Sequence, residues 1–377
     1  MSKGNSRPKA LLAFGAVLAL GSSTLRLAAA DAEPGVPVRI VRSRPAPRLE
    51  LPKEPAVAWQ TRVLEPLLGA PVADGTQFVI AHASGLVVEL DAKGRARSTV
   101  RAGSSLAFGP LLFASRRRLV VTGDAEAVVL LPSGRIESKQ KLSFRELDSN
   151  ATAVAMSDGG VLLGGGARFA RLGPTGALTA RGSVRESLRA VFEWRGLGVL
   201  VERGGRLLGL GYAGDPYELA NLGRSVRAAE LRGDRLLALV GDRELVELDL
   251  ETRAVRTLWA EPPLVPRDLF ALPNGDVRIV ASSNLLVALD ATGHEAFRVV
   301  QPGLGSEATI TLLGDARGAM VVATDGLDLR LVGDGGDVVE IPGTACPDPL
   351  RPTALANGLV VASCRSGLLF GISGRAR

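Results

Sequence analysis

The stretch from Asn284 to Val300 reads NLLVALDATGHEAFRVV, and far earlier in the chain Gly85 to Val100 reads GLVVELDAKGRARSTV. Both stretches join a short apolar run to Leu-Asp-Ala and place a glycine three residues after the aspartate. Segments of this kind occur eight times in the 377 residues, with turns near residues 94, 134, 176, 214, 252, 293, 336 and 374. A spacing of about 40 residues is typical of a repeat architecture.

Each repeat contains a second turn about half a period earlier. These turns fall at Asp74-Gly75, Ser115-Arg116, Asp158-Gly159, Arg195-Gly196, Gly233-Asp234, Asn274-Gly275, Asp315-Ala316 and Asn357-Gly358. Two hairpin turns in each repeat imply four strands. Apolar runs such as GVLVE and LLALV do not alternate with polar residues, which is typical of strands covered on both faces. The sequence therefore predicts an all-β, eight-bladed β-propeller of four-stranded antiparallel blades, with seven blades as the open alternative.

The last repeat is one strand short, because only Arg-Ala-Arg follows Gly374. Near the start, AVAWQTRVLE (Ala56–Glu65) has the composition of a strand but belongs to no repeat. We predict that this N-terminal strand completes the last blade, which closes the ring and covers both sheet edges. The propeller then spans residues 56–377, and the Pro- and Arg-rich residues 31–55 form an extended linker.

The first 30 residues have the pattern of a secretory signal peptide. Lys3, Arg7 and Lys9 precede the apolar run Ala10–Leu20, and small residues follow in LAAADA. We predict cleavage and export to the periplasm or the cell surface, with an uncleaved anchor helix as the alternative. Since neither cysteine lies near this segment, a lipoprotein anchor is excluded.

Charge and composition exclude several kinds of site. The formal charge falls from +6 to +2 without residues 1–30, so the remaining chain lacks the basic excess of a nucleic-acid-binding protein. His82 and His294 are the only histidines and occupy unrelated repeat positions, which predicts neither a metal site nor a catalytic triad. Asp91, Asp249 and Asp290 recur at the first position of a turn, where an aspartate accepts hydrogen bonds from backbone N–H groups.

The motif LLVALDATG resembles the repeat of pyrroloquinoline-quinone-type, or quinoprotein-like, propellers. Asn284–Gly293 and Gly85–Gly94 match that repeat best, Arg243–Trp259 matches more loosely, and Trp59 suits the outer strand of the last blade. The family contains quinone-dependent dehydrogenases and non-catalytic propellers, such as the one that assists outer-membrane protein assembly in bacteria. The dehydrogenases hold the quinone between a tryptophan and a vicinal Cys-Cys disulfide beside a calcium ion, and this chain has no Cys-Cys pair. The resemblance therefore implies a protein-binding scaffold without a cofactor, with a quinone-dependent or other enzyme as the alternative.

Four arginines recur at one repeat position. Arg189, Arg227, Arg267 and Arg351 each stand six or seven residues before the first turn of their repeat. Equivalent positions of a ring lie near one another, so we expect the four guanidiniums to surround one mouth of a central channel and bind an acidic partner segment. The alternative is that Glu186, Glu230 and Asp268 neutralise them locally. We expect the neighbouring loop Ala260–Asp268 to contribute to the contact, and the protein to be a monomer.

Cys346 and Cys364 are the only cysteines and are 18 positions apart. The repeat model places both at the same rim of the ring, next to the closing blade. We expect them to form a disulfide in an oxidising compartment, with two free buried thiols as the alternative.

Overall fold

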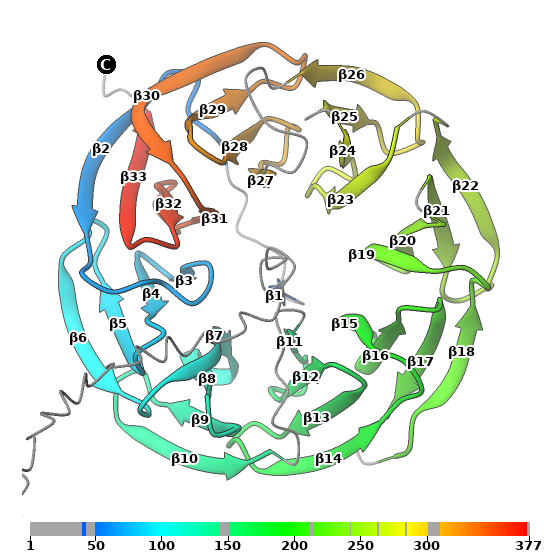
Figure 1. The fold of residues 1–377 in the computed structure, drawn as a ribbon, viewed down its shortest axis with the longest axis horizontal. Coiled ribbons are helices and arrows are strands. Elements are labelled where there is room, and N and C mark those ends of the chain that lie inside the picture. The colour runs from blue at the N-terminus through cyan, green and yellow to red at the C-terminus, as the bar shows by residue number, and fades with distance from the viewer. Residues whose placement is uncertain are drawn as a thin grey trace, which may run out of the picture. The chain divides into compact units, whose positions relative to one another are not determined.

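The computed structural model describes residues 40–42, 50–142, 151–211, 214–241, 243–261, 264–282, 285–300 and 310–374. The chain divides into Met1–Gly35 and Val36–Arg377, and only the second unit is described below. The predicted signal peptide lies outside the described residues. The described chain folds into seven four-stranded sheets and one five-stranded sheet. Figure 1 shows these sheets arranged as the blades of a ring, which confirms the predicted all-β, eight-bladed propeller.

Each of the first four blades runs from an innermost to an outermost strand in chain order. Blade 1 contains β3 (Val72–Asp74), β4 (Gln77–Ala81), β5 (Leu86–Leu90) and β6 (Ala96–Arg101). Blade 2 contains β7 (Leu106–Phe113), β8 (Arg117–Thr122), β9 (Glu126–Leu130) and β10 (Ile136–Lys141), with a short 3-10 helix at Ala114–Arg116. Blade 3 contains β11 (Thr152–Ala155), β12 (Val161–Gly165), β13 (Arg168–Leu172) and β14 (Leu178–Ser183). Blade 4 contains β15 (Leu188–Trp194), β16 (Leu197–Glu202), β17 (Arg206–Leu210) and β18 (Tyr217–Asn221).

The second half of the ring repeats this order. Blade 5 contains β19 (Val226–Arg232), β20 (Arg235–Val240), β21 (Glu244–Asp249) and β22 (Val255–Ala260). Blade 6 contains β23 (Pro266–Ala271), β24 (Val277–Ala281), β25 (Leu285–Leu289) and β26 (Glu295–Val300). Blade 7 contains β27 (Ile310–Gly314), β28 (Met320–Thr324), β29 (Leu327–Val332) and β30 (Val338–Cys346). Blade 8 contains β31 (Pro349–Ala354), β32 (Val360–Cys364), β33 (Leu368–Gly374) and, from the start of the chain, β2 (Pro55–Arg62).

The repeated Leu-Asp-x-x-Gly motif forms the turn between the third and fourth strands. In blade 6 the N–H of Gly293 donates to the carbonyl of Asp290, and the N–H of Asp290 donates to the carbonyl of His294. Gly293 has φ +96°, a conformation that favours glycine. The register shifts between Ala288 and Leu289, so the turn continues into a β-bulge. This local geometry explains why the motif keeps both its aspartate and its glycine.

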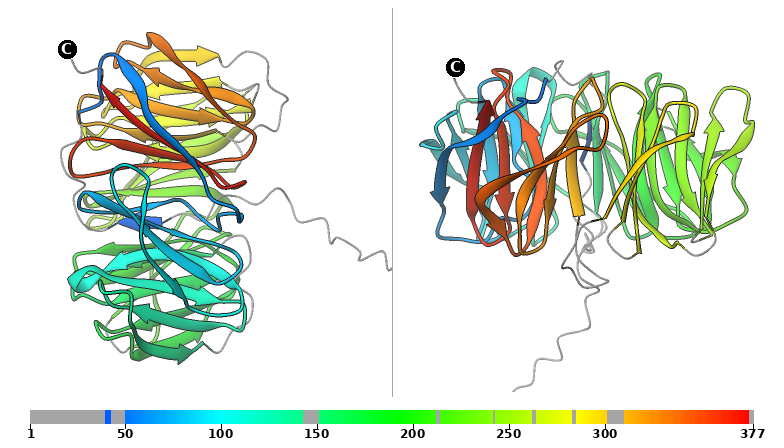
Figure 2. Two further views of the ribbon diagram at one scale, coloured as in Figure 1. Left: turned by 90° about the vertical axis from the view of Figure 1, so that its left-hand side faces the viewer. Right: turned by 90° about the horizontal axis from the view of Figure 1, so that it is seen from above.

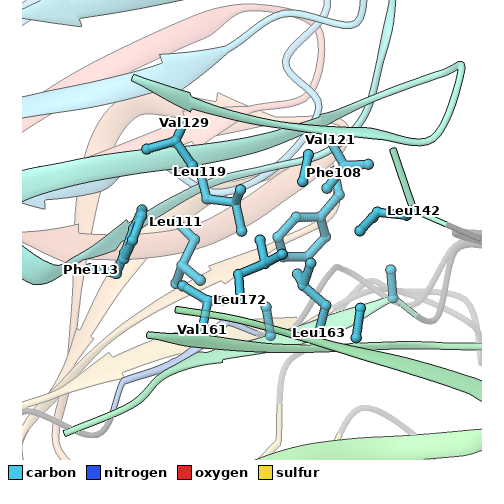
Figure 3. Packing of buried hydrophobic residues seen from close by; sticks show 14 of the residues in the cluster. Phe108, Leu111, Phe113, Leu119, Val121, Val129, Leu142, Val161, Leu163 and Leu172 are labelled. Atoms are coloured by element: carbon cyan, nitrogen blue, oxygen red, sulfur yellow. The ribbon is translucent and has the colours of Figure 1, made fainter. Parts of the chain in front are cut away.

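The hydrophobic core lies between the blades, in eight clusters that each join two neighbouring blades. Figure 3 shows the cluster between blades 2 and 3, where Phe108 and Leu119 face Val161 and Leu163. Both faces of a middle strand are therefore covered, and all five residues of β24 are buried. This burial accounts for the continuous apolar runs in the sequence.

The ring closes as predicted. β2 pairs antiparallel with β33, from Pro55 opposite Gly374 to Arg62 opposite Leu368. β2 is therefore the outermost strand of blade 8, beside blade 1 (Figure 1).

The linker range contains one further strand. β1 (Ile40–Arg42) pairs in parallel with β11 and adds a fifth strand to blade 3. Figure 1 shows β1 near the centre of the ring, inside β11. The linker was predicted as an extended tether, and the repeat pattern did not predict this pairing.

Candidate functional site

The two rims of the ring differ in the connections that they carry. The innermost strand of each blade begins at one rim, which we call the entry rim, near Leu188, Val226, Pro266 and Pro349. It ends at the opposite rim, which we call the turn rim, where the turns between first and second strands and between third and fourth strands lie. Figure 2 shows the ring from the side, with the strands running between the two rims. Any group near the start of an innermost strand therefore belongs to the entry rim.

The four predicted arginines occupy one structural position. Arg189, Arg227 and Arg267 each fall at a shift of register between the first and second strands of their blades, and Arg351 falls at the corresponding shift in blade 8. At such a bulge the extra residue leaves the ladder and its side chain is re-aimed. Arg227 is exposed and the other three are half-buried. The structure thus places the four arginines on innermost strands, in the half of each strand nearer the entry rim.

Arg351 reaches beyond its own blade. Its guanidinium carbon lies 5.5 Å from the centre of the Phe270 ring, which belongs to β23 of blade 6. A guanidinium at this distance from an aromatic ring interacts favourably with its π-electrons. The contact spans blade 7 and brings groups of blades 6 and 8 together on the axis side of the ring.

The carboxylates named as neutralising partners lie at different depths. The carboxylate of Asp268 accepts a hydrogen bond from the N–H of Leu269 at 2.8 Å. Glu230 lies further along β19 towards the turn rim and is only 7% exposed. Glu186 lies in the connection before β15 and is exposed. The entry rim therefore carries both signs of charge, with the arginines at the bulges.

In blade 5, a buried glutamate pairs with three arginines. Glu247, on β21, accepts hydrogen bonds from Arg256, Arg232 and Arg235 at 2.8, 2.5 and 2.8 Å. Burial disfavours the ionised form of Glu247, but the three guanidiniums outweigh it and hold the pKa below its usual value. A carboxylate held ionised by three cations is a poor proton acceptor, so this group suits blade stability better than acid–base chemistry.

The histidines lie at opposite rims. His82 is buried at the entry rim, with Nδ1 3.2 Å from the carbonyl oxygen of Glu65. His294 is exposed in a third-to-fourth turn, with Nδ1 2.7 Å from the hydroxyl of Thr292. The structure does not bring the two imidazoles into one site.

Cys346 and Cys364 form a disulfide whose Cα atoms are 5.7 Å apart. Cys346 ends β30, the outer strand of blade 7, and Cys364 ends β32 of blade 8. Asp348 lies close to both sulfurs. Because the two sulfurs are bonded to each other, they do not offer the thiolates that a metal ion would need.

Sequence reasoning did not identify β1 as part of the ring interior. Its signal was weak: Val38, Ile40 and Val41 stand among arginines in a segment interrupted by prolines.

The loop Ala260–Asp268 lies at the entry rim, and residues 262 and 263 of it are outside the described residues. No helix in the described part of the chain is long and apolar enough to cross a bilayer.

No family model and no curated protein matches this chain. Solved structures do share its fold. BamB from Moraxella catarrhalis is similar with a TM-score of 0.67 and 15% identity, covering 85% of this chain and 99% of its own. Sqt1 from Saccharomyces cerevisiae has a TM-score of 0.65 and 9% identity, and the match covers 85% of this chain and 99% of Sqt1. Virginiamycin B lyase from Staphylococcus aureus has a TM-score of 0.55 and 12% identity, and the match covers 71% of this chain and 94% of the lyase. Identities this low carry the fold alone.

Proposed function

We propose that this chain is a non-catalytic, exported propeller that binds an acidic segment of a protein partner at the entry rim. The observation that carries the proposal is the placement of Arg189, Arg227, Arg267 and Arg351 at equivalent bulges. A guanidinium offers a fixed fork of donors that matches a carboxylate, so several forks at one rim suit an acidic peptide. A rigid ring with variable connections supplies the scaffold.

We place this activity in the cell envelope, in the periplasm or at the cell surface, where a monomeric propeller assists protein assembly. Three features support that location. The N-terminal segment has a signal-peptide pattern, the repeat resembles that of the bacterial outer-membrane assembly propeller, and the Cys346–Cys364 disulfide suits an oxidising compartment.

The alternative is an enzyme on the same fold, since virginiamycin B lyase shares it. One solved form of that lyase is a histidine variant described as catalytically inactive, whereas the histidines of this chain lie at opposite rims. A quinone enzyme would need a different cysteine arrangement, because these two cysteines join blades 7 and 8. Adding quinone and calcium to the purified protein and recording its absorbance tests this alternative, and a bound-quinone spectrum would support it.

The binding proposal is tested with a fluorescein-labelled oligoglutamate peptide. Replacing Arg189, Arg227, Arg267 and Arg351 by alanine should weaken binding at least tenfold by fluorescence anisotropy, about 1.4 kcal/mol. Binding to the wild type should also weaken as salt rises, because the Debye length is about 8 Å at physiological ionic strength.

A matched variant removes the same charge elsewhere. Alanine at four exposed arginines on the turn rim, in or beside the turns between third and fourth strands, should leave binding near the wild-type value; these are Arg95, Arg97, Arg135 and Arg253. Equal loss in both variants would mean that net charge alone attracts the peptide, and the entry rim would then not be the site.

A further inference from the structure

β1 is a strand added to the inside of the ring. It pairs in parallel with β11, with Ile40, Val41 and Arg42 opposite Ala153, Val154 and Ala155. The other edge of β11 is taken by β12. β1 therefore uses the edge of blade 3 that faces the ring axis, as Figure 1 shows.

β11 has the backbone that an added strand requires. Its pairing with β12 runs without a shift from Thr152 to Ala155, whereas the innermost strands of blades 2, 4, 5, 6 and 8 each contain a shift of register. A bulge disrupts the hydrogen-bonding ladder, and a regular edge leaves its N–H and C=O groups in register for a partner. The side chains of β11 are also small or β-branched, and Thr152, Ala153 and Val154 are buried.

The charge pattern favours the same blade. The linker around β1 carries Arg39, Arg42, Arg44 and Arg48. The bulge arginines lie on blades 4, 5, 6 and 8, whereas β11 carries no charged residue. A basic segment therefore meets less repulsion on blade 3 than on those four blades.

The linker is anchored a short distance after β1. Leu51 is 3% exposed within the core between blades 7 and 8. Its N–H donates to the carboxylate of Asp315 at 3.0 Å, and its carbonyl accepts from Arg317 at 2.9 Å. The nine residue-to-residue steps from Arg42 to Leu51 reach at most about 30 Å when extended. Tethering of this length keeps β1 at a high effective concentration beside β11.

We propose that the axis edge of β11 is an acceptor site for an extended peptide strand, and that the chain's own segment around Ile40–Arg42 fills it intramolecularly. A peptide partner that uses this edge must displace β1. A pairing of three residues is short enough for such exchange. The proposal rests on backbone pairing and does not depend on the bulge arginines.

The test uses the full chain with Val41→Pro, because proline removes a backbone donor and fits poorly in a paired strand. In the wild type, hydrogen exchange at Ile40–Arg42 should be slow, and in the variant it should become fast. A labelled synthetic peptide of residues 36–46 should then bind the variant at least tenfold more tightly than the wild type. This basic peptide does not report on the arginine site, which would repel it, so the two proposals fail independently.

The matched control is Ala46→Pro, which adds a proline between Pro45 and Pro47 outside β1 and should behave as the wild type. A 36–46 peptide that carries Val41→Pro should bind neither protein. Equal binding of the unmodified peptide to both proteins, or none to the Val41→Pro chain, would overturn the acceptor site. Protection at Ile40–Arg42 that disappears on dilution would overturn the intramolecular assignment, because a second copy would then supply the strand.

Discussion

At the scale of single residues, the aspartate of the repeated turn combines several hydrogen bonds in one carboxylate. Oδ1 of Asp290 accepts from the hydroxyl of Thr292 at 2.6 Å and from the N–H groups of Thr292 and His294 at 2.8 and 3.0 Å. The Thr292 hydroxyl and these N–H groups hold the pKa of Asp290 below its usual value. Asp91 and Asp249 accept similar backbone hydrogen bonds in blades 1 and 5. The predicted structural role of these aspartates is therefore confirmed.

This lowered pKa gives Asp290→Ala a pH-dependent effect. A carboxyl whose pKa is lower in the folded state stabilises the fold above its unfolded pKa, about 3.9, and this contribution is lost as pH falls through the folded value. We expect the variant to unfold at lower urea concentration than the wild type at pH 7, with the difference shrinking below about pH 4. Asp290→Asn keeps an oxygen acceptor without charge, so it should restore part of the stability and remove the pH dependence. A difference that stays constant with pH would contradict this account.

How much the sequence could predict follows from how local each feature is. The turns were predictable because a single aspartate and a single glycine, such as Asp290 and Gly293, specify their geometry. The closing strand was predictable because the last repeat was visibly one strand short. The bulges at Arg189 and Arg227 could not be predicted, because a shift of register depends on the partner strand as well. β1 was missed because three residues of backbone pairing leave almost no trace in the side chains.

At the scale of elements, polar groups connect neighbouring blades at separations close to the repeat length. Arg118 of blade 2 donates to Asp74 of blade 1, and Arg278 of blade 6 donates to the carbonyl of Gly318 in blade 7. Equivalent contacts connect further blades, namely Arg171 to the carbonyl of Gly211, Arg195 to Asp234, and Arg232 to the carbonyl of Gly275. Where the ring closes, the N–H of Ala356 in blade 8 donates to the carbonyl of Gly75 in blade 1. Buried apolar clusters supply most of the contact between blades, and these polar groups fix their alignment.

The contact between blades 1 and 2 is a buried ion pair. Asp74 and Arg118 are 3% and 2% exposed, and Arg118 also donates to Glu89. Asp74→Ala removes one of the two carboxylates that pair with the buried Arg118 cation and leaves Glu89 in place, so we expect a loss of about 1–3 kcal/mol in unfolding free energy. Chemical denaturation followed by fluorescence measures it.

The matched control for this contact is Asp234→Ala at the junction of blades 4 and 5. The Arg195 and Asp234 side chains are 54% and 45% exposed, so water and ions screen their attraction. This variant should shift the denaturation midpoint much less than Asp74→Ala. Similar shifts in the two variants would show that burial does not set the strength of these contacts.

At the scale of the whole propeller, the two ends of the repeat array are joined by β2. Trp59 of β2 donates from Nε1 to the carbonyl of Ala92 in blade 1 at 2.6 Å, and its ring stacks on Phe78 with centroids 6.0 Å apart. A side chain at Gly371 would collide with this indole, since its Cβ would lie 2.2 Å from Trp59. β2 therefore completes blade 8 and binds blade 1 at the same time, which leaves neither end of the array as an open edge.

The Cys346–Cys364 disulfide reinforces the same closing region from the other side, because it links the outer strand of blade 7 to blade 8. In the chain-entropy model, a bridge between residues 18 apart stabilises the fold by about 3 kcal/mol. Replacing both cysteines by alanine should lower the unfolding free energy by about that amount. Thiol titration of the denatured wild type should find no reactive thiol without reductant and two after reduction. Two reactive thiols without reductant would mean that the bridge does not form in the protein, and the closing blade would then depend on β2 and the apolar clusters beside it.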